Sequence, residues 1–115
     1  MEIRIGDHRT QTYHVNFYAF GTDRIITAAI RAGPTAVEDV RIWTSETYEG
    51  TVGLRQTGEQ TWIYPGATSA EGFSLGTFNA NQEKSIEIKL NLPSPPGRPG
   101  ENLIPLRIGN GGAPG

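Results

Sequence analysis

The chain has 115 residues, and ten Arg or Lys against twelve Asp or Glu give it a net charge of −2. This balance excludes a basic nucleic-acid surface, and the absence of cysteine excludes both a disulfide framework and a thiolate metal site. Fifteen glycines and eight prolines indicate many turns and little helix. We expect one domain over residues 1–110 and a Gly/Pro tail over 111–115. The apolar runs are too short to cross a membrane, and the N-terminal residues show no targeting segment.

The first half of the chain predicts four strands. Apolar and polar residues alternate at 2–5 and 11–20, which predicts a strand in each range. Both faces of the strand at 11–20 are partly apolar, so we expect it to be covered on two sides by a second sheet or another subunit. Residues 25–31 fit either a helical or a strand period, and the flanking glycines with the β-branched residues favour a strand. In the fourth strand, 38–44, Val40, Ile42 and Thr44 should face one side and Arg41 with Trp43 the other.

The second half predicts the rest of an antiparallel sandwich. Short strands are expected at 52–55 and 60–64, followed by a connection at 67–76 that crosses between sheets. The clearest alternation is Ile86, Ile88, Leu90 and Leu92 between polar residues, and a second run follows at 103–108. We interpret these two runs as the last hairpin. The whole pattern predicts an all-β, Ig-like antiparallel β-sandwich of seven to eight strands.

Aromatic residues are the most informative surface candidates, because aromatic side chains with Arg form interface hot spots and can also stack on sugar rings. One of the two tryptophans should be core. A subunit interface is expected at Tyr18, Phe20, Arg41, Trp43 and the 93–100 loop, with Pro95, Pro96 and Arg98. A glycan platform on Tyr48, Trp62 and Tyr64 is the alternative.

Candidate catalytic groups are weak. Gly72-Phe73-Ser74-Leu75-Gly76 matches the G-x-S-x-G nucleophile elbow, but no histidine lies downstream, so Phe73 and Leu75 should be core and Ser74 solvent-facing. His8, His14 and Asp7 lack metal-ligand spacing. The acid pairs Glu38–Asp39 and Glu46/Glu49 lie at a strand start and in a loop, as solvated acids do. We therefore expect no enzyme, metal or cofactor.

Residues 78–93, then 97–100 and 103–108, resemble the closing hairpin of bacterial and phage immunoglobulin-like domains, in which a turn feeds a long alternating strand that ends at a proline. The strands at 40–43 and 62–64, together with a start that shows no signal segment, are similar to small structural proteins of tailed-phage virions. This resemblance implies a non-enzymatic capsid decoration or tail protein, located in the virion and acting by assembly. Its partners would be copies of itself, as a homo-oligomer, or a larger capsid or tail protein, without nucleic acid or membrane. A carbohydrate-binding or adhesive module is the alternative function.

Overall fold

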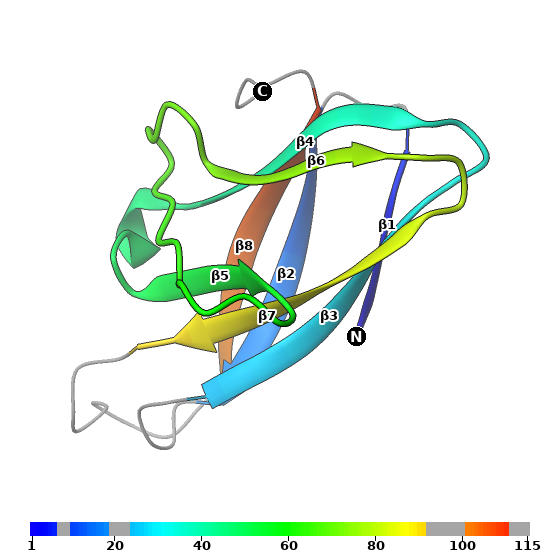
Figure 1. Ribbon diagram of the computed structural model, residues 1–115. Coiled ribbons are helices and arrows are strands. Elements are labelled where there is room, and N and C mark those ends of the chain that lie inside the picture. The colour runs from blue at the N-terminus through cyan, green and yellow to red at the C-terminus, as the bar shows by residue number, and fades with distance from the viewer. Residues whose placement is uncertain (7–9, 19–23, 92–100, 111–115) are drawn as a thin grey trace.

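The chain folds into two four-stranded β-sheets in the part that the computed structural model describes, residues 1–6, 10–18, 24–91 and 101–110 (Figure 1). One sheet has the strand order β1-β3-β7-β5 and the other β2-β8-β4-β6. The elements are β1 Glu2–Ile5, β2 Thr10–Tyr18, β3 Arg24–Ala32, β4 Val37–Thr44, the short 3₁₀ turn η1 Glu46–Tyr48, β5 Val52–Gln56, β6 Phe73–Phe78, β7 Glu83–Leu90 and β8 Glu101–Gly109. The predicted all-β sandwich is therefore confirmed.

The pairing of β7 and β8 differs from the sequence prediction. They were expected to form the last hairpin, but β7 lies between β3 and β5 in one sheet, whereas β8 lies between β2 and β4 in the other. The predicted hairpin is wrong because alternation identifies a strand and its buried face without identifying its neighbour. One pair, β1 with β3, is parallel, so the first sheet is mixed.

Apolar residues on the inner faces of both sheets form one core. Each strand contributes alternate residues, as a pleated strand with one buried face requires. The buried core residues are Ile3, Ile5, Val15, Phe17, Ala28, Ile30, Ala32, Val37, Val40, Ile42, Val52, Leu54, Phe73, Leu75, Phe78, Ile86, Ile88, Leu90, Ile104, Leu106 and Ile108. Because these side chains point inward, the neighbours that alternate with them form the two outer faces.

Two local predictions need correction and a third is confirmed. Residues 60–64 form no full strand but a single bridge to β5, and the expected connection at 67–76 ends at Phe73, where β6 begins. The second face of β2 is not covered within the chain at His14 and Asn16, which are both exposed. The isoleucine-rich segment that allowed a helix is strand β3.

The free edge of β6 is covered by a lysine. The Nζ of Lys84 donates hydrogen bonds to the carbonyl oxygens of Leu75, at 2.6 Å, and Thr77, at 2.9 Å, and lies 4.7 Å from the ring centroid of Phe78. Unpaired edge groups attract other strands, and a charged side chain across the edge discourages such pairing. The described residues contain no helix long and apolar enough to span a membrane.

Stability should fall at alkaline pH through Tyr13. Its hydroxyl donates to the Arg4 carbonyl and contacts the Gln11 side chain, and burial raises the pKa of Tyr13 above its ordinary value. The folded chain thus holds the phenolic proton more tightly than the unfolded chain. This contribution is complete below the ordinary tyrosine pKa of about 10 and is lost as pH rises through the folded value. Between neutral and strongly alkaline pH, the free energy of unfolding measured in urea should fall less for Tyr13→Phe than for the native chain. Equal losses in the two proteins would contradict the assignment of this loss to Tyr13.

Candidate functional site

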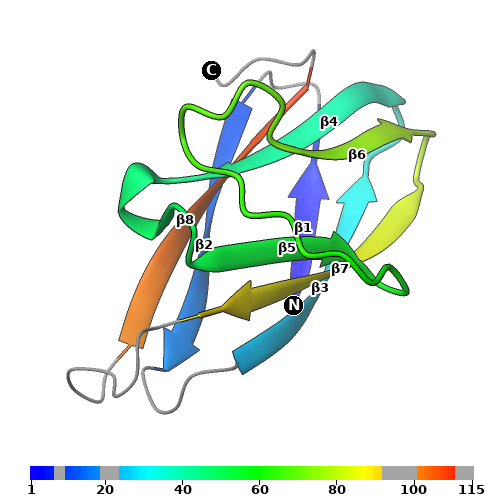
Figure 2. The ribbon, with the colours of Figure 1, turned by 60° about the vertical axis from the view of Figure 1, so that its left-hand side comes forward.

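A short extended segment lies along the outer edge of β5. The backbone N–H of Leu54 donates to the carbonyl oxygen of Ile63 at 2.8 Å, and the N–H of Ile63 donates to that of Leu54 at 2.9 Å. Because Leu54 points into the core, the residues on each side of Ile63 point outward from the sheet. Trp62 and Tyr64 therefore share the outer face of β5 and β7, and in Figure 2 this segment leaves the end of β5 and continues toward β6.

Both aromatic rings pack over Gly53. A Cβ atom at this position would lie 3.0 Å from Cε1 of Tyr64 and 3.3 Å from Cε3 of Trp62. Glycine is thus the residue that lets the two rings approach the strand this closely. The Tyr64 hydroxyl also accepts a hydrogen bond of 2.9 Å from Nδ2 of Asn91.

Two cations and an acid complete this surface, which we call the Trp62 face: Arg55, Trp62, Tyr64, Glu87 and Lys89. The guanidinium carbon of Arg55 lies 4.1 Å from the Trp62 ring centroid, and Nζ of Lys89 lies 5.5 Å from it. Nε of Arg55 also pairs with Oε1 of Glu87 at 3.2 Å. Such cation–π and ionic contacts fix the indole in one position on an otherwise polar sheet.

A cavity of about 360 Å³ and another of about 260 Å³ open on the surface, and the smaller one adjoins the Trp62 face. Ile63, with 41 % of its surface exposed, is one of the residues that line the smaller cavity. The smaller cavity is lined by Arg55, Gln56, Glu59, Thr61, Ile63, Phe73 and Ser74. Arg55 thus belongs both to this cavity and to the Trp62 face.

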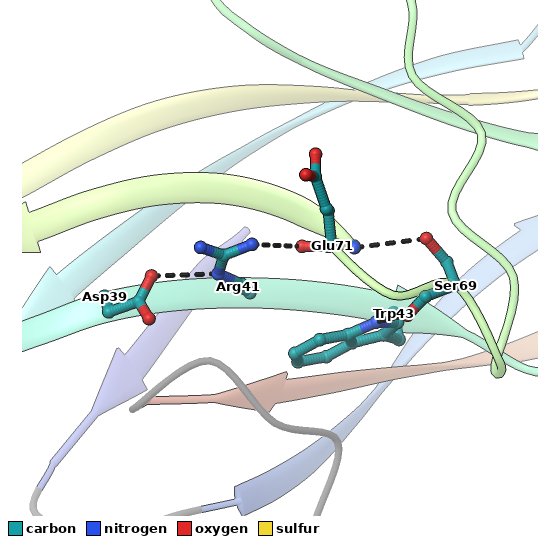
Figure 3. A network of polar contacts seen from close by, with 6 residues as sticks. Asp39, Arg41, Trp43, Ser69 and Glu71 are labelled. Atoms are coloured by element: carbon teal, nitrogen blue, oxygen red, sulfur yellow. Dashed lines mark hydrogen bonds and ion pairs between the residues drawn. The ribbon is translucent and has the colours of Figure 1, made fainter.

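Trp43 and Arg41 hold the segment that leads into β6 (Figure 3). Trp43 points outward from β4 yet is completely buried, and its Nε1 donates to the Ser69 carbonyl oxygen at 2.9 Å. Arg41 donates from Nε to Oδ1 of Asp39 at 2.8 Å and from an η nitrogen to the Glu71 carbonyl oxygen at 2.9 Å. Trp43 is thus the buried tryptophan, beneath residues 65–72 rather than between the sheets, and leaves no surface for a partner.

Gly72→Ala should destabilise the chain. Gly72 has φ of 62°, and an added Cβ would lie 2.7 Å from Cε2 of Trp43. The left-handed backbone and the overpacking together should lower the free energy of unfolding by about 1–3 kcal/mol. Gly6→Ala is the control, because nothing lies within 4 Å of its Cβ position. Equal denaturation midpoints for the two variants would contradict the packing described for Trp43.

The remaining candidates are dispersed. Ser74 is exposed on β6 between buried Phe73 and Leu75, as predicted. Tyr48 packs half-buried against the core, and the glycan platform that it would form with Trp62 and Tyr64 stays a prediction. Among the described residues no three His, Asp or Glu side chains form a metal-binding group. Three of the four paired acids are exposed, namely Glu38, Glu46 and Glu49, whereas Asp39 pairs with Arg41.

Some predicted site residues lie outside the described part of the structure. These are Asp7, His8, Phe20, Pro95, Pro96, Arg98, the tail 111–115 and the side chain of Tyr18.

Sequence reasoning missed Arg55, Glu87 and Lys89. The pairing of β5 with β7 brings them together, with Gly53 opposite Lys89 and Arg55 opposite Glu87. The alternation of Trp62 and Tyr64 around Ile63 was visible in the sequence. Gly53, between Val52 and Leu54, was the available signal that the rings of Trp62 and Tyr64 cover this strand.

The fold is a two-sheet β-sandwich, and solved structures share this fold. No protein-family model matches the chain, and no curated protein matches its sequence. A mutant of PliG from Escherichia coli, a periplasmic inhibitor of g-type lysozyme, is similar with a TM-score of 0.50 and 12 % identity, covering 95 % of this chain and 96 % of that one. PliG from Salmonella Typhimurium, also a periplasmic inhibitor of g-type lysozyme, has a TM-score of 0.47 and 14 % identity, covering 95 % and 97 %.

The expected resemblance to phage virion proteins is wrong. The E. coli protein with a TM-score of 0.50 is a mutant of a bacterial periplasmic lysozyme inhibitor, not a component of a capsid or tail. The expected virion location and capsid or tail partners are corrected with it. The features used for the resemblance to immunoglobulin-like domains were an alternating strand, a terminal proline and a glycine-containing loop, which many β-sandwiches share. The hairpin from which they were inferred is also absent from the fold.

Proposed function

We propose that this chain is a non-enzymatic protein that binds and inhibits a lysozyme in the periplasm. The observation that carries the proposal is the Trp62 face, where two aromatic side chains and an arginine are held in fixed positions. Trp, Tyr and Arg are the residue types that dominate interface hot spots. The fold shared with an E. coli lysozyme inhibitor supports the choice of partner.

The contacts within the Trp62 face favour tight binding. Gly53 supports both rings, Arg55 lies against Trp62, and Asn91 holds the Tyr64 hydroxyl. These side chains therefore lose little conformational freedom when a partner covers them, which lowers the cost of association. A stable complex would bury roughly 800 Å² on each partner. The neighbouring cavity would accept a side chain of the enzyme.

The inhibition would be steric. A protein that covers the approach to a lysozyme cleft stops hydrolysis without contributing any reacting group. This mechanism needs a rigid surface and no catalytic residue.

The experiment is a cell-wall lysis assay in which g-type and c-type lysozymes are titrated with the purified chain. We expect saturable loss of g-type activity and a complex in size-exclusion chromatography. As a control, cell walls are incubated with the chain and washed before the enzyme is added. Protection that survives washing, without a complex, would show that the chain binds glycan instead; full activity at excess chain would also refute the proposal.

A further inference from the structure

A second surface feature lies at the other end of the same sheet, where the ends of β1 and β3 meet the β6–β7 turn. It is the cavity of about 360 Å³, a volume within the usual range of small-ligand sites. It is lined by Arg4, Ile5, Arg31, Ala32, Gly33, Pro34 and Asn81, which we call the arginine cavity. The lining contains two cations and no acid.

The strand register brings the two arginines together. Arg4 of β1 lies directly opposite Arg31 of β3, and the next residues along, Ile5 and Ala32, are buried. Both guanidinium groups therefore belong to the outer face of adjacent strands, which are separated by about 4.8 Å. Like charges opposite each other are unfavourable unless a counter-ion lies between them.

The acids nearby leave this charge largely available. Glu2 engages only Nε of Arg4, at 2.9 Å, and the Arg4 side chain remains 83 % exposed. Glu83 lies opposite Arg31 on β7, yet within the described residues no ion pair joins them. Hydrogen-bond donors of both arginines can thus reach a bound anion.

The cavity wall is fixed by backbone hydrogen bonds. The N–H of Asn81 donates to the Gly33 carbonyl oxygen at 2.7 Å, and the N–H of Ala32 donates to that of Gln82 at 2.9 Å. These bonds join the β6–β7 turn to the end of β3. The pocket is consequently formed before a ligand arrives, with the Asn81 amide as an additional polar group in its lining.

We propose that the arginine cavity binds a small oxyanion ligand through Arg4 and Arg31. Planar guanidinium groups recognise carboxylates and phosphates by paired hydrogen bonds, and two of them suit a ligand with at least two negative charges. This site is separate from the Trp62 face, and its existence does not depend on lysozyme inhibition. Because the arginines are exposed, salt should weaken the binding.

The test is titration of the isotope-labelled chain, followed by NMR, with inorganic phosphate and, separately, with citrate. Sodium chloride at the same ionic strength is the control, and the two probes distinguish a phosphate from a carboxylate ligand. We expect saturable shifts of the Ala32, Gly33 and Asn81 amide signals with phosphate, citrate or both. Arg31→Gln should weaken binding by roughly tenfold or more, since a charged hydrogen-bond partner is lost.

Arg4→Gln provides an independent variant, and each spectrum reports whether the variant is folded. Arg107→Gln removes an equal charge from the opposite sheet and should leave the affinity unchanged. The proposal is overturned if chloride produces the same shifts, if neither anion produces saturable shifts, or if Arg107→Gln weakens binding as much as the cavity variants do.

Discussion

Replacing Trp43 with alanine should lower the free energy of unfolding by about 3–5 kcal/mol, as removal of a fully buried large aromatic residue does. Trp43 supports residues 65–72 from below and gives Ser69 its indole hydrogen bond. The variant leaves a void on the outer face of β4 and releases this segment. Such a loss is a large part of the total stability of a domain of this size.

Trp62→Ala is the matched control in the same denaturation experiment. Trp62 is only partly buried and packs against Arg55 and Lys89, so its loss should cost about 1–2 kcal/mol. Equal destabilisation by the two variants, measured by urea unfolding, would show that the two tryptophans do not have the different structural roles assigned here.

The same Trp62→Ala substitution should have its main effect on binding. We expect the affinity for g-type lysozyme to fall by about 2–4 kcal/mol, the range of a central interface hot spot. This corresponds to a loss of roughly thirtyfold or more. Isothermal titration calorimetry with the native chain and the variant measures the difference.

Leu103→Ala is the control for that binding experiment. Leu103 is an apolar residue with 57 % exposure on β8, in the sheet that does not carry the Trp62 face. Its truncation should leave the affinity within about 0.5 kcal/mol of the native value. If Leu103→Ala weakens the complex more than Trp62→Ala does, the partner binds the other sheet.

The individual strands were largely predictable, since most bury one face and alternate. Ile86, Ile88 and Leu90 face the core as their pattern requires. Their neighbours in space were not predictable, because the strands that flank β7 come from distant parts of the chain. Local alternation contains no information on such pairing.

The candidate site was predictable in part. The sequence drew attention to Trp62 and Tyr64, although with Tyr48 and for a glycan. Arg41 and Trp43 were expected on a contact surface because their outward direction was correctly inferred. Residues 65–72 return over the outer face of β4, where they bury Trp43 completely and Arg41 in part. A strand pattern reports which way a side chain points, but not whether a connection covers it.

The most direct test of the central claim is an NMR titration of the labelled native chain with unlabelled g-type lysozyme. The chain has two tryptophans, so the two indole N–H signals report separately on Trp62 and on the buried Trp43 in one spectrum. The Trp62 signal should shift or broaden together with the amide of Gly53, while the Trp43 signal stays in place. An unchanged Trp62 signal at saturating enzyme would contradict the account, because either no complex forms or it forms elsewhere.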